Sequence, residues 1–275
     1  MSRSVAFHGR HAACSRFPPV RGHAPNGQDP SYGGRLRELD WDGYRNVRDL
    51  GGLPTPSSPT GATQRGRIAR GPRRELLTDR GWQDARVWGL RSVVDLRCAD
   101  EVGRREGDPL VAPDALTDIT VVAAPTEDQD DPEFREVCFP ILDSPEYWRH
   151  NWRILPDLVL GALRAIADAP SGVLVHCSAG RDRTGMLSTL LLANAGVPPT
   201  VVAEDHAASV RAMAGTGTHA PGDRQATWDA DQVTEWLATV TPIVEDVAAD
   251  VDAAFAAVGA DDDLRARLRA RLTTP

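Results

Sequence analysis

The sequence predicts an α/β fold in which a central, mostly parallel sheet is flanked by helices and followed by a C-terminal helical lid or extension. Short apolar runs rich in β-branched residues alternate with segments of helical periodicity, which is the order typical of parallel strands joined by helices. With 275 residues, of which 41% are hydrophobic, the chain can bury an ordinary core. We expect residues 36–275 to form a single domain and residues 1–35 to be a disordered leader.

The first predicted elements are a hairpin and one helix. Residues 36–52 end in paired glycines shortly before Pro54, which is a turn signal, and residues 66–71 (GRIARG) have the pattern of a short strand. Together these segments predict a hairpin. Residues 78–89 (TDRGWQDARVWG) begin with a capping Thr or Asp and end with Gly, which frames one amphipathic helix.

Three later apolar runs predict the parallel part of the sheet. Residues 90–97 (LRSVVDLR) and 119–124 (ITVVAA) are expected to form buried strands because they are rich in β-branched residues. Helical periodicity over residues 144–170, interrupted near Pro156, leads into a third strand, GVLVHC, at residues 172–177. Strands connected in this way lie parallel to one another.

The rest of the chain is predicted to be helical. A helix is expected over residues 184–195, because Gly196 and Pro198 follow it as stop signals. Residues 200–272 continue with helical periodicity after that stop. A glycine-rich break at residues 214–223 could hinge a helical lid over the site described below.

Composition argues against several kinds of partner. A net charge of −8 disfavours binding to nucleic acid or to an anionic membrane surface. No apolar run reaches the roughly 18 residues of a membrane span, and the N-terminus lacks the apolar core of a signal peptide. We therefore expect a cytoplasmic protein without an integral membrane segment, with export by a non-classical route left open. The four cysteines are widely spaced, which predicts free thiols and no zinc-type metal site.

The segment VLVHCSAGRDRTGML carries the main functional signal. Cys177 ends a predicted strand, at the sheet edge where ligands bind in α/β proteins. Gly180 permits a sharp turn, and a helix is expected to begin at about Thr184. The successive N–H groups from Ser178 to Arg183 can then point inward at the positive end of that helix. The segment therefore predicts a cradle for an oxyanion.

A cysteine at the centre of this cradle predicts nucleophilic chemistry. The amides and the helix dipole stabilise a thiolate at Cys177, and Arg183 can fork around two oxygens of a phosphoryl group. Thr184 can donate its hydroxyl to the sulfur as it leaves. These groups suit two-step transfer through a covalent thiophosphate without any cofactor or metal. The predicted substrate-binding residues are Ser178, Ala179, Gly180, Arg181 and Thr184. The alternative is a buried structural cysteine at a strand end.

The loop HCSAGRDRTG, residues 176–185, resembles that of the cysteine-dependent phosphatases. More narrowly, it resembles the bacterial atypical tyrosine phosphatases, whose loop reads HCxxGKDRTG and which include tyrosine-lipid phosphatases. The segments NVRDLGG (46–52) and SVVDLRCADE (92–101) resemble two further motifs of that family. The resemblance implies a cysteine-phosphatase-like fold and a protein-tyrosine phosphatase that acts through a phosphocysteine. Dual or phosphoinositide specificity is left open.

The resemblance also implies that Asp182 is the general acid that protonates the leaving oxygen. A separate-loop aspartate could serve instead, and the sequence offers Asp128, Asp130, Asp131, Asp143 and Asp157. Arg181 stands where the family has lysine. Because all 31 basic residues of the chain are arginines, we interpret this difference as retained positive charge under a chain-wide bias. It leaves the preference between protein and lipid substrates open.

Other motif residues have competing interpretations. Arg48 and Asp49 could form an ion pair near the mouth of the site or could hold the hairpin. Asp95 and Arg97 are expected to be structural, and His176 is expected to shape the loop rather than act as a base.

Two alternative functions remain at this point. One keeps the chemistry but assigns soluble inositol polyphosphates or other small phosphate esters as substrates. The other is a non-catalytic phosphate-binding or redox module, although such modules usually lack the cysteine or the arginine. The sequence makes no prediction about oligomeric state.

Overall fold

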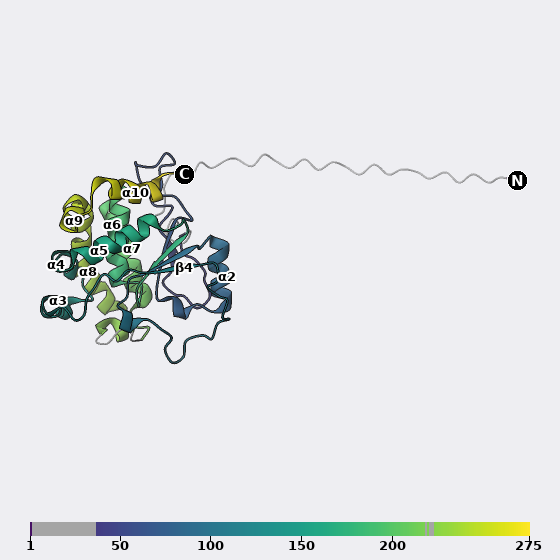
Figure 1. The fold of residues 1–275 in the computed structure, drawn as a ribbon, viewed down its shortest axis with the longest axis horizontal. Helices are drawn as coiled ribbons and strands as arrows, with labels where there is room; N and C mark the ends of the chain where they lie inside the picture. Colours follow the sequence, from purple (N-terminus) through teal and green to yellow (C-terminus); the bar gives the residue numbers. More distant parts are fainter. Residues whose placement is uncertain (2–36, 218, 220–222) are drawn as a thin grey trace.

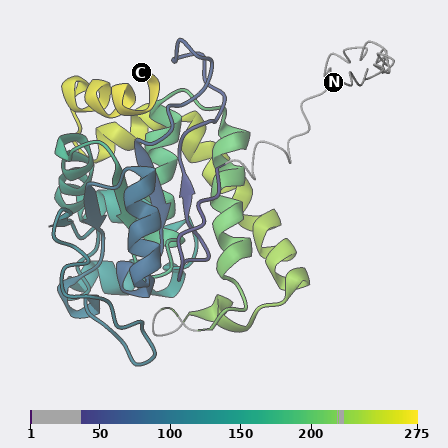
Figure 2. The ribbon, with the colours of Figure 1, turned by 90° about the vertical axis from the view of Figure 1, so that its right-hand side faces the viewer.

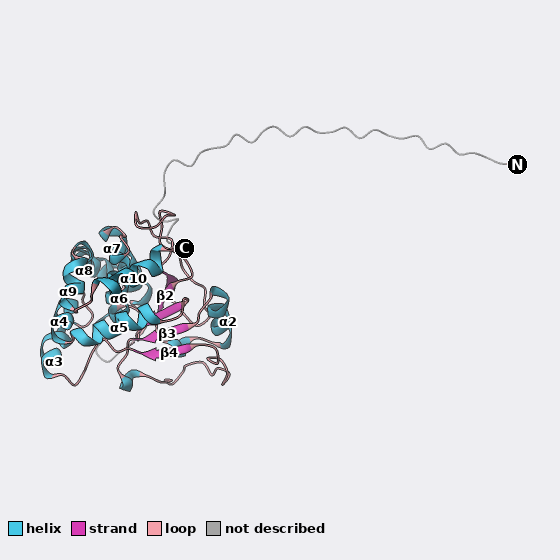
Figure 3. Cartoon of the chain, turned by 45° about the horizontal axis from the view of Figure 1, so that its top comes forward, coloured by secondary structure: helices cyan, strands magenta, loops and turns pink. Residues whose placement is uncertain are grey.

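The computed structural model describes Met1, residues 37–217, residue 219 and residues 223–275. The predicted leader, residues 1–35, therefore lies outside the described residues apart from Met1. The predicted hinge at residues 214–223 is described only in part. Within the described residues, one sheet separates a layer that contains helix α2 from a thicker layer of helices (Figures 1 and 3).

The sheet has five strands in the order β1-β2-β5-β3-β4. Strand β1 (Arg48–Asp49) pairs antiparallel with β2 (Ile68–Gly71), which forms the predicted hairpin. The other pairs are parallel: β2 with β5 (Val173–His176), β5 with β3 (Ser92–Asp95), and β3 with β4 (Thr120–Ala123). The α/β prediction with a mostly parallel sheet is therefore confirmed. Because β5 is the middle strand, the loop that follows it lies at the centre of the carboxyl edge.

Strand β4 corrects one prediction. Residues 119–124 were expected to form a buried strand, yet three of the four residues of β4 are exposed and Val122 is only half-buried. The reason is position: β4 is the edge strand, next to β3 alone. Burial on both faces requires neighbours and covering layers on each side, and the β-branched pattern by itself does not reveal whether a strand is central or at an edge.

Helix α2 (Asp79–Trp88) covers one face of the sheet. Its predicted boundaries hold: the Thr78 side chain accepts a hydrogen bond from the Gly81 N–H, and Gly89 closes the helix with a φ of 111°. The alternating strand residues that point to this face pack with α2 in one apolar cluster. Its strand and helix members include Ala69, Val93, Leu174, Trp82 and Ala85.

Most of the remaining helices lie on the opposite face (Figure 1). They are α3 (Pro132–Cys138), α4 (Tyr147–Ile154), α5 (Pro156–Asp168), α6 (Asp182–Asn194), α9 (Val251–Ala257) and α10 (Asp262–Thr273). The larger core forms here, and Val94, Val173 and Val175 supply its strand side. The predicted break at Pro156 separates α4 from α5. Helix α6 begins at Asp182 rather than at about Thr184, so the predicted acid and arginine lie in its first turn.

The C-terminal extension consists mainly of α7 (Pro199–Met213) and α8 (Ala230–Ala249), which run side by side (Figure 2). Val210 and Ala207 of α7 pack against Val233, Leu237 and Val240 of α8 in a separate apolar cluster. In the part of the chain that the structure describes, no helix combines the length and apolar character that crossing a bilayer requires.

Candidate active site

The loop between β5 and α6 begins at Cys177, which is 2% exposed at the carboxyl end of the central strand. Gly180 lies in this loop with a φ of 68°, a conformation that glycine adopts without strain. A Cβ at Gly180 would lie 2.4 Å from the carbonyl oxygen of Gly71. The loop can therefore turn this closely against β2 only with glycine at this position.

The loop carbonyls are held from outside the loop. The backbone N–H of Arg73 donates to the Ser178 carbonyl at 3.0 Å. The side-chain amide of Asn46 donates to the carbonyls of Ala179 and Gly180 at 3.1 and 3.2 Å. In a trans peptide the N–H points opposite to the preceding C=O. The amides that follow these three carbonyls therefore face the inside of the loop, as an oxyanion cradle requires.

A buried carboxylate, Asp205 of α7, organises the residues behind the loop. Arg70 donates to Asp205 at 2.6 Å and to the Gly180 carbonyl at 2.8 Å. Arg48 donates to Asp205 at 3.0 Å, and Arg37 also pairs with it. Burial alone would raise the pKa of Asp205, but these guanidinium groups outweigh that effect and hold the pKa well below its usual range. Asp205 therefore stays ionised and fixes Arg70 against the loop.

Arg48 and Asp49 have separate partners. Arg48 donates to the Oδ1 atom of Asn46 at 2.7 Å, which orients the amide that supports the loop. The Asp49 carboxylate accepts from the backbone N–H groups of Gly51 and Gly66 at 2.7 and 2.8 Å. Among the described residues, no ion pair joins Arg48 to Asp49. Asp49 therefore holds the hairpin, whereas Arg48 belongs to the support behind the loop.

Arg183 lies in the first turn of α6 between two carboxyl groups. Both of its terminal nitrogens donate to Glu101, at the end of the short helix η2 (Ala99–Glu101), with the Nη2 bond at 2.6 Å. The Nη1 atom also lies 3.5 Å from the carboxyl of Glu127. Burial acts to raise the pKa of Glu101, but hydrogen bonds from Arg183 outweigh it and lower the pKa. Because a guanidinium has five N–H donors, this fork leaves donors for a tetrahedral anion.

Arg181 connects the predicted acid to a more distant segment. Its Nε donates to Asp182 at 3.0 Å, and its Nη2 donates to Asp223 at 3.0 Å. Burial raises the pKa of Asp182 above its ordinary value, although the Arg181 guanidinium acts in the opposite direction. A carboxyl group with a raised pKa keeps its proton to higher pH, which is the property that a general acid needs.

His176 and its neighbours stabilise the strand end. Its Nδ1 atom lies 3.0 Å from the Cys177 carbonyl oxygen. Burial lowers the pKa of His176 to about 4, so the ring is neutral at physiological pH. Asp95 and Arg97, at the end of β3, form an ion pair at 2.7 Å. These contacts support structural roles for the three residues.

A pocket of about 730 Å³ opens above the loop. The three predicted catalytic residues, Cys177, Asp182 and Arg183, all line it. Among the predicted substrate-binding residues, Ser178, Ala179 and Arg181 also line it, whereas Gly180 and Thr184 do not. The Thr184 hydroxyl is buried and has no hydrogen-bond partner in the described part of the chain. The geometry therefore brings a thiol, a carboxyl and a guanidinium to one cavity.

The alternative acids are distributed differently. Asp143 lines the same pocket and pairs with Arg224 at 2.6 Å. Asp131 caps α3 by accepting from the Phe134 N–H, which is a structural role. Neither Asp131 nor Asp157 is among the described residues that line this pocket. Position therefore favours Asp182 and Asp143 over these two.

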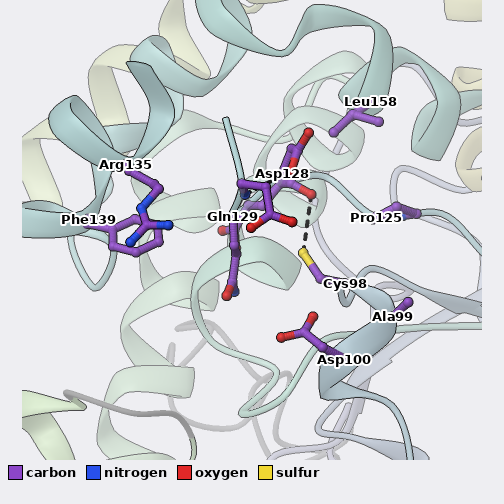
Figure 4. A pocket seen from close by; sticks show the side chains of 11 residues that line it. Cys98, Ala99, Asp100, Pro125, Asp128, Gln129, Arg135, Phe139 and Leu158 are labelled. Carbon is purple, nitrogen blue, oxygen red and sulfur yellow. Dashed lines mark hydrogen bonds between the residues drawn. The ribbon is translucent and has the colours of Figure 1, made fainter. Parts of the chain in front are cut away.

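A second pocket of about 600 Å³, drawn in Figure 4, shares lining residues with the first. Asp128 and Asp130 line it rather than the loop pocket, and Glu127 lines both. Cys98 also lines it, and its thiol donates to the Glu127 carbonyl at 3.2 Å, the dashed line in Figure 4. The two pockets therefore meet at Glu127, together with Asp100, Gln129 and Phe139.

Several site residues were not anticipated from the sequence: Asn46, Arg70, Glu101, Glu127, Asp205 and Asp223. Asn46 begins the NVRDLGG motif and Glu101 ends the SVVDLRCADE motif, so the resemblance had marked both positions without a role. Asp205 lies in EDHAAS (204–209), where the family tends to have D-Y-x2-S, but no function was carried over to that segment because His206 replaces the aromatic residue. The other three lie in segments that carried no such signal. Their roles come from distant chain segments meeting behind and above the loop.

The chain is similar to known phosphatases. A model of the tyrosine phosphatase family matches residues 39–274. A tyrosine-protein phosphatase of Nostoc commune is 30% identical over 160 residues, which cover 54% of this chain and 54% of that protein. The triple specificity protein phosphatase PtpB of Mycobacterium tuberculosis is 31% identical over 199 residues, covering 62% of this chain and 68% of that protein. This chain thus spans about half the length of the first relative. The family match extends over most of the chain and includes the loop, and the chain therefore belongs to the tyrosine phosphatase family.

Proposed function

We propose that the protein is a protein-tyrosine phosphatase that hydrolyses phosphomonoesters through a phosphocysteine at Cys177. One observation carries the proposal: Cys177, Asp182 and Arg183 line a single pocket, over a loop whose carbonyls are turned outward. The family match and the names of the two relatives support the same reaction class.

In the first step, the Cys177 thiolate attacks phosphorus. The S–P bond forms as the bond between phosphorus and the tyrosine oxygen breaks, and Asp182 gives its proton to that oxygen. Arg183 and the inward-facing amides stabilise the charge on the equatorial oxygens, for which preorganised donors are effective. The Thr184 hydroxyl, buried beside the loop, can donate to the sulfur.

In the second step, water hydrolyses the phosphocysteine. The Asp182 carboxylate takes a proton from the attacking water, the S–P bond breaks, and the thiolate returns as inorganic phosphate leaves. One carboxyl serves as acid and then as base, which splits a difficult displacement into two easier ones.

The pocket favours a monophosphorylated protein over a phosphoinositide. The charge of Arg181 is balanced by Asp182 and Asp223, although its Nη1 atom has no partner among the described residues. The lining also contains Arg105 and Arg224, but its carboxyl groups outnumber its guanidinium groups by six to four; the carboxyl groups belong to Asp100, Glu101, Glu127, Asp143, Asp182 and Asp223. A second or third phosphate on an inositol ring would meet these carboxyl groups, whereas the neutral ring of phosphotyrosine would not.

Initial rates of phosphate release test this proposal. We expect a phosphotyrosine peptide to be hydrolysed faster than a phosphoserine peptide, phosphatidylinositol phosphates or soluble inositol polyphosphates, with a chelator present throughout. Faster release from inositol polyphosphates would replace the substrate class but keep the chemistry. Release that the chelator abolishes, or no release from any substrate, would contradict the proposed phosphatase.

Asp182→Asn tests the general acid. We expect kcat on a phosphotyrosine peptide to fall by roughly 10²–10⁴-fold, because the tyrosine oxygen needs a proton to leave. The kcat on an activated aryl phosphate should fall much less, since the leaving group of that substrate is stable as an anion. Asp143→Asn is the matched control in the same pocket. An equal loss on both substrates, or the selective loss in Asp143→Asn instead, would remove Asp182 from this role.

A further inference from the structure

Glu127 is a buried carboxyl group that the steps above leave without a role. It follows strand β4, is 6% exposed and lines the loop pocket together with Cys177 and Arg183. Its carboxyl lies 3.5 Å from Nη1 of Arg183, the guanidinium that is expected to hold the phosphoryl group. A phosphoryl group bound to Arg183 would therefore approach Glu127 closely.

When both carboxyl groups beside Arg183 are ionised, the charge around it is already negative before any substrate binds. One guanidinium faces two carboxyl groups, and Glu101 takes two hydrogen bonds from it while Glu127 takes only the longer contact. A bound oxyanion would add two further negative charges to this partly buried cluster. Like charges so close favour protonation of one of them, and the less well satisfied carboxyl is the one that gains the proton.

We propose that Glu127 takes up a proton from solvent when an oxyanion binds and then donates a hydrogen bond to a phosphoryl oxygen. This inference rests on the proposed phosphatase function, because it assigns a further substrate-binding residue to the same pocket. The proton comes from water or buffer and moves to one carboxylate oxygen of Glu127, so that the net charge added to the site is reduced by one.

The surroundings of Glu127 support this assignment. Burial raises the pKa of Glu127, and Glu101 and Asp182 add to that shift, while Arg183 and Tyr147 oppose it. Glu101, by contrast, has a lowered pKa and stays ionised. The titratable and charged groups that face Glu127 from the packed elements are Arg183 and Asp182 of α6, Glu101 and Asp100 of η2, Tyr147 of α4, Cys138 and Arg135 of α3, Cys98 before η2, and Asp128 and Asp130 of its own loop. Arg183 is the cation in contact with Glu127. Arg181 and Arg224, which also line the loop pocket, pair with carboxyl groups of their own, and Arg105 donates to the His219 carbonyl.

Calorimetry with sulfate tests the proposal without turnover. Sulfate is a tetrahedral dianion that does not titrate near neutral pH, and Cys177→Ser removes any proton that the thiol would contribute. Binding heats in buffers of different ionisation enthalpy then give the number of protons taken up. We expect about one proton per sulfate, and an affinity that falls by up to about tenfold per pH unit as Glu127 ionises.

The paired variants assign the proton. In the Cys177→Ser background, Glu127→Gln should abolish most of the proton uptake and flatten the pH dependence of sulfate affinity. The glutamine amide keeps a hydrogen-bond donor but cannot titrate. Asp128→Asn removes the same charge from the next residue, which is exposed and lines only the adjoining pocket, and should leave the uptake unchanged. Thermal melting checks that each variant is folded.

The outcomes separate this inference from the proposed function. If Cys177→Ser binds no sulfate, the proposed oxyanion pocket is contradicted. If it binds sulfate without proton uptake, or if Glu127→Gln keeps the uptake, the pocket stands and the role of Glu127 is wrong. The pH dependence of sulfate affinity in Cys177→Ser alone gives a further test should Glu127→Gln fail to fold: an affinity independent of pH overturns the role.

Discussion

Cys177→Ser is expected to lower turnover by roughly 10⁴-fold or more while oxyanion binding is retained. The hydroxyl replaces the sulfur with little change in size, so the cradle of amides keeps its shape. It is nevertheless a far weaker nucleophile, because it is not ionised at the pH of the assay. The measurement is the initial rate of phosphate release, together with sulfate affinity by calorimetry. The affinity should change by only a few fold.

Cys98→Ser is the matched control for this substitution. Cys98 is half-buried in the adjoining pocket, and its thiol donates to the Glu127 carbonyl, a bond that a hydroxyl can also make. We expect Cys98→Ser to keep its activity to within a few fold. Turnover by folded Cys177→Ser at a rate near that of the wild type would contradict covalent catalysis.

Arg183→Lys is expected to lower kcat by roughly 10³-fold and to weaken oxyanion binding as well. The guanidinium forks onto Glu101 and still has donors for the phosphoryl group, whereas an ammonium is a point charge on a flexible stem. Lysine cannot bind Glu101 through two parallel bonds and an oxyanion at the same time. Steady-state kinetics should therefore show a lower kcat, and calorimetry should show a lower sulfate affinity.

Arg224→Lys controls for the loss of an arginine in this pocket. Arg224 lines the same pocket but pairs with Asp143 at the rim, where its side chain is 55% exposed. We expect this variant to change kcat and affinity only a few fold. If Arg183→Lys behaved in the same way, the bidentate role of Arg183 would be wrong.

The loop could be predicted from the sequence because its signal is contiguous. An apolar strand, a cysteine, a glycine and a helix start lie within about a dozen residues, and each has a local physical meaning. The support behind the loop could not be predicted in this way. Asn46 contacts the loop across 133 positions of the chain, and Asp205 reaches Arg48 across 157. Such contacts follow from how the sheet and α7 pack.

Burial is the second property that the pattern did not reveal. The run at residues 119–124 has the composition of an interior strand, yet β4 is exposed because it lies at the sheet edge. Glu127, a few residues later in a loop that is acidic in sequence, is buried against Arg183. The pKa of each carboxyl group depends on such differences in burial and partners, which a linear pattern does not contain.

Mapping the phosphorylated residue tests the central claim most directly. The wild-type enzyme is mixed with a radiolabelled phosphotyrosine peptide in the presence of a chelator, quenched within one turnover, digested and analysed by mass spectrometry. We predict one phosphoryl group, located on the peptide that contains Cys177. Label on a different side chain, or undiminished phosphate release after Cys177 has been alkylated, would contradict the account.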